Sequence, residues 1–323
     1  MRLFIAALAA QLCVGFAPFA AAPAAASCGA ENCPLDQAAR WDEASFHFEL
    51  SQQYIDQSQP RVGTEDAVVG QIASPEDEVR TVNRITIGRA SYGWSPAWTA
   101  SLALPYVDRT HEHIHNDLGE QEYLRWKYHG IGDLEAGVTR RLGGSGMHGF
   151  LTAAVKAPTG VRNVQEIDGD QPEPTARPGT GSWDFMGGAG AEWHLRVAAF
   201  QGRGGVPLRA SVNGRWNGRG TERYRVGSEV TAHLAAEAPA FSWGTFLLQT
   251  NLRVHAKDDV GKTDAEAGNT GGTALYLSPG MRVGGGGTYL YGLVQIPVYQ
   301  RVNGIQLVSD SNLFVGFTHA FVR

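Results

Sequence analysis

Three histidines alternate with other residues in one short stretch, at His111, His113 and His115. An extended backbone points every second side chain to the same face, so the three imidazoles would lie together. Imidazole nitrogen, with carboxylate oxygen from nearby Glu112, suits zinc, nickel or copper. The stretch therefore predicts a divalent-metal site. Two alternatives stay open: imidazoles that hydrogen-bond and narrow the mouth of a pore, and ordinary polar loop residues.

A second set of residues carries charge on alternate positions of strand-like segments. We expect these side chains to line an enclosed lumen and to act as a selectivity filter, as rings of charge do in channels. The excess of arginine between 209 and 225 would then favour anions. Alternatively, opposite charges pair only to fill a narrow interior, because unpaired buried charge is costly. The set consists of Asp184, Glu192, Arg209, Arg215, Arg223, Arg225, Glu229 and Arg253.

Cysteine usage predicts a small disulfide-closed loop between Cys28 and Cys33, because the chain carries an export signal and disulfides persist in oxidising compartments. A redox-active or metal-binding thiol pair is the alternative, although its usual spacing is C-x-x-C. The third cysteine, Cys13, leaves with the signal peptide.

Nucleophilic catalysis finds little support. Ser228 and His233 are on one predicted strand but on opposite faces, and Gly-x-Ser-x-Gly does not occur in the sequence. We therefore expect no enzyme, and no cofactor other than a divalent metal at the histidines.

The elements that must position these residues are β-strands with period-two alternation. In 243–254 one face is apolar, with Phe246, Leu248, Leu252 and Val254. The other face is polar, with Thr245, Gln249, Asn251 and Arg253. The same pattern predicts about twelve strands, at 44–55, 79–92, 97–107, 132–142, 149–158, 182–195, 206–216, 223–236, 243–255, 272–283, 287–299 and 311–322.

Long and short connections alternate between these strands. The long ones are expected at 57–77, 109–131, 159–180 and 256–271, with shorter ones after 216 and 299. Tight turns such as 93–96 and 143–146 separate them. A transmembrane up-and-down antiparallel barrel of the outer membrane has this asymmetry, because one rim carries turns and the other carries surface loops. A soluble periplasmic β-sandwich is the third interpretation.

The N-terminus and the composition agree with export to the outer membrane. Arg2, an apolar run and small residues predict a signal peptide over 1–26, and a lipoprotein cut before Cys28 is the alternative. A short periplasmic leader over 27–40 and the barrel over 41–323 follow. No later segment reaches the ~20 apolar residues of a spanning helix. The net charge of −5 gives no cationic field for nucleic acid.

Several short sequence motifs occur in the same order as in a known family, which the chain therefore resembles. They are Leu104-Pro105-Tyr106, His111 to Asn116, Gly130 to Leu134, Lys156 to Gly160 and Gly179 to Phe185. Together they resemble the outer-membrane barrels labelled meta-pathway phenol-degradation proteins, over about Trp41 to Arg323. The resemblance implies a transmembrane barrel and a role in passing small hydrophobic or aromatic compounds. It implies no catalytic residues.

The sequence thus predicts a passive outer-membrane channel or transporter for a small solute. The alternative is a metal-binding or structural barrel that uses the histidine stretch and keeps its lumen closed. Expected partners are outer-membrane lipid and lipopolysaccharide, the outer-membrane assembly machinery and the solute. The last strand, which ends near Phe321, resembles the C-terminal signal that the assembly machinery reads.

Overall fold

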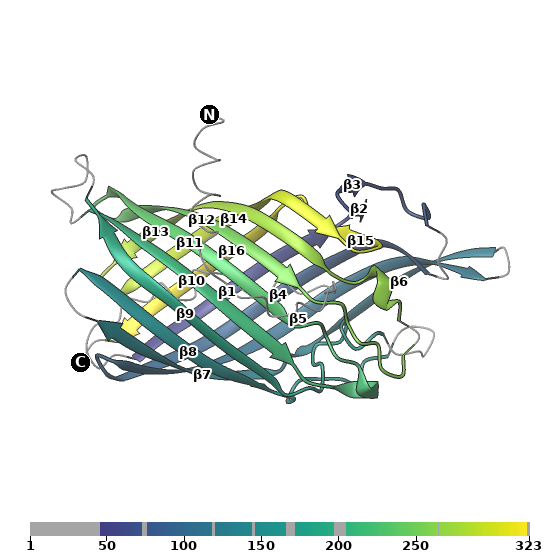
Figure 1. Cartoon of the computed structure of the whole chain (residues 1–323), viewed down its shortest axis with the longest axis horizontal. Coiled ribbons are helices and arrows are strands. Elements are labelled where there is room, and N and C mark those ends of the chain that lie inside the picture. Colours follow the sequence, from purple (N-terminus) through teal and green to yellow (C-terminus); the bar gives the residue numbers. More distant parts are fainter. Residues whose placement is uncertain are drawn as a thin grey trace, which may run out of the picture.

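The alternating segments form a closed barrel of twelve antiparallel strands in the computed structural model of the chain (Figure 1). The structure describes residues 46–72, 76–117, 120–143, 146–165, 172–196, 205–263 and 265–321. The predicted signal peptide, the leader and the Cys28–Cys33 disulfide therefore lie outside the described residues. The barrel strands are β1 (Phe46–Gln57), β4 (Glu76–Ser95), β5 (Trp98–Asp117), β7 (Leu134–Gly143), β8 (Met147–Ala157), β9 (Asp184–Leu195), β10 (Val206–Asn217), β11 (Glu229–Phe241), β12 (Gly244–His255), β13 (Gly272–Gly285), β14 (Thr288–Val302) and β16 (Asn312–Phe321).

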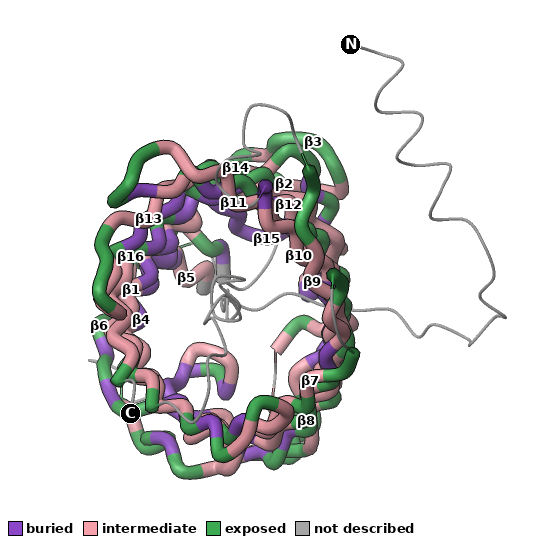
Figure 2. Tube along the Cα trace, turned by 90° about the vertical axis from the view of Figure 1, so that its left-hand side faces the viewer, coloured by how far each residue is buried: buried purple, intermediate pink, exposed green. Residues whose placement is uncertain are grey.

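Closure is made by the first and last strands. Phe46 of β1 lies opposite Phe321 of β16, and the pairing runs on to Ile55 and Asn312. Figure 2 looks along the barrel and shows the resulting ring. Closing the sheet removes the free strand edges, which would otherwise leave backbone hydrogen-bonding groups unpaired. Each of the predicted strands overlaps one strand of this barrel, so the predicted fold class is confirmed.

The prediction of a loop over 109–131 is wrong. β5 continues to Asp117, and β6 (Glu120–Ile131) pairs antiparallel with the outer half of β5. In this pairing Asp117 lies opposite Glu120, and Tyr106 lies opposite Ile131. The hairpin projects past the rest of its rim (Figure 1). Both faces of this part carry polar residues, so the alternation that marks a lipid-facing strand is absent from its sequence.

The predicted strand over 223–236 also needs correction, since β11 begins only at Glu229. A short 3₁₀ turn, η3 (Thr221–Arg223), precedes it, and Glu222 and Arg223 there have positive φ angles of 56° and 61°. Left-handed backbone breaks the strand, although the apolar alternation of Tyr224 and Val226 continues the pattern in sequence. A second short turn is η4 (Ala267–Asn269). Among the described residues, no helix is long and apolar enough to cross a membrane.

The two faces of the barrel wall divide as the alternation predicts. On β12, Leu248 is 49% exposed on the outside, whereas Gln249 is 2% exposed on the inside. Outward aromatic side chains lie toward both rims, with Trp94 and Trp243 near one, and Tyr106 and Trp183 near the other. This outer surface, apolar with aromatic bands, matches that of transmembrane barrels.

The two rims differ as expected. One, the turn rim, joins β4 to β5, β11 to β12 and β13 to β14 by tight turns. The other, here called the outer rim, carries the β5–β6 hairpin and the long connections after β1, β8, β10, β12 and β14. Short strands in these connections, β2 (Gln59–Val62), β3 (Glu65–Asp66) and β15 (Ile305–Val308), form a small separate sheet on that rim.

Candidate functional site at the outer mouth and in the lumen

Charged side chains inside the barrel are arranged as ion pairs between neighbouring strands. Arg209 on β10 lies 2.8 Å from Glu192 on β9, its register partner. Arg253 on β12 donates to Glu229 at the start of β11. Of the predicted lining, these four residues, with Arg215 and Asp184, therefore lie inside and compensate each other's charge, as the low-dielectric interior requires.

Asp133, Lys156 and Asp184 form the most buried of these charge clusters, here called the mouth cluster. The Lys156 ammonium lies 3.0 Å from Asp133 Oδ2 and 2.7 Å from Asp184 Oδ2. All three side chains are at most 4% exposed. Arg215 approaches Asp184 at 3.3 Å from β10. The cluster links strands β7 to β10 at the level where they enter the outer rim.

The connection between β8 and β9 is held to the mouth cluster by backbone hydrogen bonds. Asp133 accepts from Gly160 N–H at 2.8 Å and from Thr180 N–H at 3.0 Å. Thr180 Oγ1 also donates to Asp133 Oδ2 at 3.0 Å. Deeper in the same connection, Arg109 of β5 donates to the Thr175 carbonyl at 2.9 Å. The connection therefore folds over the barrel mouth and is anchored there.

Glycines allow this connection to lie flat on the wall. A Cβ at Gly179 would lie 2.6 Å from the carbonyl carbon of Gly160, and one at Gly160 would lie 2.7 Å from that of Gly132. Only glycine tolerates such backbone contact. Three motifs that are far apart in the sequence thus meet at one place in the structure, namely those around Gly132, Lys156 and Gly179.

Arg223 and Arg225 lie outside the lumen. Both belong to the β10–β11 connection on the outer rim, where Arg225 faces Asp259 at 3.7 Å, and Arg219 contacts the same carboxylate at 2.5 Å. Of the arginines predicted for the lumen between 209 and 225, Arg209 and Arg215 therefore lie inside the barrel, whereas Arg223 and Arg225 do not. Beside them, Tyr224 donates to the buried carboxylate of Asp258, which ties this connection to the one after β12.

The histidines lie on the outer half of β5. Their alternation is that of a strand, with His111 opposite Thr81 of β4 and opposite Trp126 of β6. The His111 and His113 rings are 5.4 Å apart, and His113 packs edge-on against Trp126. Thr81 Oγ1 and His111 Nδ1 are hydrogen-bonded at 2.8 Å. Burial, with neighbouring His113 and Arg109, lowers the pKa of His111 to about 3, so its imidazole is neutral.

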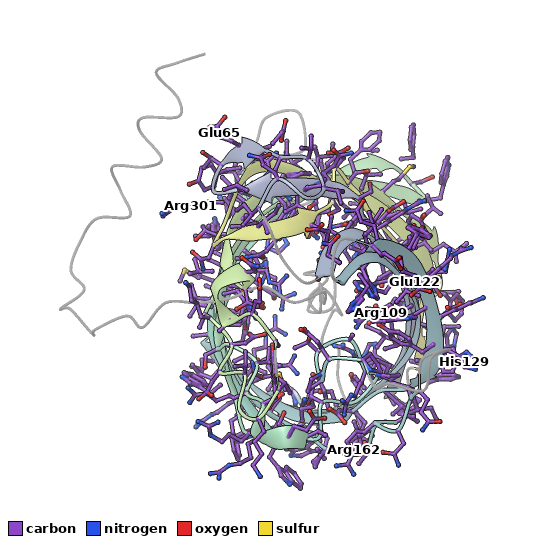
Figure 3. The ribbon with its side chains drawn as sticks, turned by 90° about the vertical axis from the view of Figure 1, so that its right-hand side faces the viewer. Glu65, Arg109, Glu122, His129, Arg162 and Arg301 are labelled. Atoms are coloured by element: carbon purple, nitrogen blue, oxygen red, sulfur yellow. The ribbon has the colours of Figure 1, made fainter. Side chains whose placement is uncertain are left out.

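No group of three or more His, Cys, Asp or Glu side chains in the described ranges is placed to hold a metal ion. Figure 3 shows the outer-rim view, with Arg109 inside the barrel and His129 on the outside of the same wall. Metal binding by His111, His113 and His115 stays a prediction.

The opposite wall of the lumen is lined by carboxamides and hydroxyls. Asn251 donates to Ser278 at 2.9 Å, and Asn312 donates to Gln295 at 2.8 Å. His233, weighed above as a catalytic group, is hydrogen-bonded through both ring nitrogens, to Asn251 and Thr231 at 3.0 Å each. Below this network Leu247, Tyr291, Leu293 and Phe314 form a buried apolar cluster.

A cavity of about 290 Å³ lies between the two walls. Its lining includes the mouth cluster, Arg209 and Arg215 on one side. Gln53, Glu229, Arg253 and His255 line the other. His255 was not among the predicted site residues, although it shares the face of Gln249, Asn251 and Arg253 and the alternation could have identified it.

The chain was compared with family models, curated proteins and solved structures, and only the solved structures gave matches. No family model matches the chain, and no curated protein matches its sequence. Among solved structures, an outer membrane channel from Pseudomonas putida F1 superposes with a TM-score of 0.59, at 12% identity over 87% of this chain and 96% of that one. The transport unit of the autotransporter AIDA-I from Escherichia coli gives 0.50, at 11% identity over 88% and 93%. The chain has the fold of an outer-membrane β-barrel. At such identities the likeness concerns the fold alone.

Proposed function

We propose that this outer-membrane barrel is a passive channel for a small solute. The observation that carries the proposal is the 290 Å³ cavity, which is enclosed by the barrel wall and lined by paired charges and hydrogen-bonding side chains. Such a lining solvates a polar passenger without a strong net field. The anchored β8–β9 connection would then cover one side of the mouth, so that only a narrow entrance is left for a small solute.

The resemblance noted in the sequence implies small aromatic or hydrophobic compounds as passengers. The apolar part of the lining, with Ile85, Val107, Phe150 and Met186, is compatible with such solutes. No energy coupling is invoked, because diffusion down a gradient through a fixed lumen needs none.

Single-channel recording of the refolded protein in a planar bilayer tests the proposal. Steady conductance steps support a channel. A correctly inserted, heat-modifiable barrel that stays silent would overturn it. Zinc or copper is then added on the outer side, both to the wild type and to a variant in which His111, His113 and His115 are replaced by alanine. This comparison distinguishes a channel from the alternative, a metal-binding barrel. Metal binding lost with unchanged conductance would favour a metal-capturing barrel.

We also propose that lipopolysaccharide contacts the outward face of β4, β5 and β6. Register aligns Arg84, Asp108 and His129 in one row, and Arg80, Glu112 and Arg125 in another. Lys127 lies between these rows and is exposed. Both rows lie closer to the tip of the β5–β6 hairpin than Tyr106, which is 44% exposed in the outer aromatic band. Cations at this level suit lipid phosphates, and the acids suit bridging divalent ions.

Quantifying lipopolysaccharide that co-purifies with the protein tests this contact. Replacing Arg84 and Lys127 by glutamine should reduce the amount several-fold. The control replaces Arg219 and Lys262 by glutamine, which removes the same charge from another part of the outer rim. Equal losses in both variants would refute a site on this face.

A further inference from the structure

A second, smaller cavity of about 100 Å³ lies at the outer rim, beside the β15 segment. Its lining comes from the outer ends of β1, β12, β13, β14 and β16 and from β15. It lies away from the β8–β9 connection, since no described residue of that connection lines it. We call it the rim cavity, and the larger one the lumen cavity.

The two cavities meet along two separate walls. On β12, Arg253 and His255 line both of them. On β1, Gln57 and Ile55 line the rim cavity, and Gln53, the next residue on that face, lines the lumen cavity. Alternate residues of one strand face the same side, so the lining runs without a break from the rim into the lumen.

Buried polar atoms without a protein partner mark this route. His255 is 7% exposed, and its Nδ1 has no hydrogen-bond partner among the described residues. The same holds for Asn312 Oδ1 on the rim cavity and for Gln53 Oε1 on the lumen cavity. Asn312 Nδ2 is engaged by Gln295, which leaves the oxygen as the free group. Buried polar atoms are normally paired, so these atoms point to a passenger or water that supplies the bond.

The mouth cluster differs in this respect. Asp133 receives hydrogen bonds at both carboxylate oxygens, and Lys156 contacts Asp133, Asp184, Thr180 and Ser182. Because the hydrogen-bonding groups of Asp133 and Lys156 are already engaged, the cluster holds the β8–β9 connection over the mouth and leaves none of these groups for a solute.

We propose that solute reaches the lumen through the rim cavity, past His255 and Arg253, and not through the β8–β9 side of the mouth. The proposal rests on the proposed channel function. The unpaired atoms at Asn312 and Gln53 are acceptors, and the neighbouring Arg253 charge is compensated by Glu229. The passenger that fits is therefore small, uncharged and able to donate hydrogen bonds, as a hydroxylated molecule does.

Cysteine labelling in single channels tests the route. Thr273 lines the rim cavity, and Val161, 40% exposed, lies on the β8–β9 connection. Each is replaced by cysteine in a background without other cysteines and treated with benzyl methanethiosulfonate, a neutral reagent that adds bulk only. Modification at Thr273→Cys should lower conductance at least about two-fold, and modification at Val161→Cys should leave it nearly unchanged. Recording each channel before the reagent shows that it is folded.

Swelling of proteoliposomes in erythritol tests the passenger class. His255→Leu should slow erythritol uptake several-fold relative to the wild type, and His148→Leu on β8, outside both cavity linings, is the matched control. Unchanged uptake in His255→Leu would overturn the passenger class. Block at Val161→Cys but not at Thr273→Cys would overturn the route. A silent wild type that also excludes erythritol would instead overturn the channel function itself.

Discussion

Lys156 and Asp184 are register partners on β8 and β9, and the lysine ammonium lies 2.7 Å from the carboxylate with both side chains buried. Asp133, which directly precedes β7, completes the cluster, and its carboxylate accepts hydrogen bonds from the backbone N–H groups of Gly160 and Thr180. One cation thus fixes the barrel wall to the connection that covers the mouth.

Replacing Lys156 by methionine should destabilise the barrel by roughly 3–5 kcal/mol, because the buried Asp133 carboxylate then loses its cation and Asp184 keeps only Arg215. The change is measured as the drop in the temperature at which the folded band disappears on heat-modifiability gels. Lys127→Met, an exposed lysine on β6, is the control and should change this temperature little. A Lys156→Met variant with wild-type thermal behaviour would contradict the role of the cluster.

Gly179→Ala should loosen the β8–β9 connection, because the new Cβ would lie 2.6 Å from the Gly160 carbonyl carbon. Overpacking of this kind costs about 1–3 kcal/mol. We expect faster hydrogen exchange at Gly160 and Thr180 and noisier, larger single-channel currents. Gly88→Ala on β4, where the added Cβ meets nothing within 4 Å, is the matched control. Identical exchange in both variants would argue against a tightly packed connection.

The strands and their faces could be predicted from the sequence, because period-two alternation follows directly from contact with lipid on one side. Leu248 and Gln249 show this plainly. The mouth cluster could not be predicted, since the contact of Asp133 with Lys156 depends on strand register and on how the β8–β9 connection folds. Arg225 was misplaced because Tyr224 and Val226 extend an apparent strand past a turn, and only the backbone angles at Glu222 and Arg223 reveal the break.

Glu229→Gln should shift the ion selectivity of the channel toward anions. The substitution removes the charge that compensates Arg253 while keeping a hydrogen-bond acceptor, so the lumen gains one net positive charge. The reversal potential in a potassium chloride gradient measures the shift. Glu65→Gln, on the exposed β3 strand of the outer rim, makes the same formal change far from the lumen. An equal shift in both variants would mean that the total charge, rather than the lumen pair, sets selectivity.

Asp258→Asn should change how stability depends on pH. Burial raises the pKa of the Asp258 carboxyl from 3.8 to about 6, against hydrogen bonds from Tyr224 and Gly227 that favour the carboxylate. A carboxyl whose folded pKa is raised stabilises the folded state most below its unfolded pKa, and this contribution is lost as pH rises through about 6. The loss is at most about 3 kcal/mol.

Thermal midpoints in detergent micelles between about pH 2.5 and about pH 7.5 measure this linkage, because the contribution of Asp258 changes between 3.8 and about 6 and that of Asp259 changes mainly below 3.8. As pH rises, the Asp258→Asn variant should gain stability relative to the wild type. Neighbouring Asp259 gives the opposite sign, because its hydrogen bond with Arg219 lowers its pKa, so its contribution is present at neutral pH and lost in acid. Asp259→Asn should therefore lose stability relative to the wild type as pH rises. Parallel trends in the two variants would show that Asp258 is not buried against Tyr224 in the folded barrel.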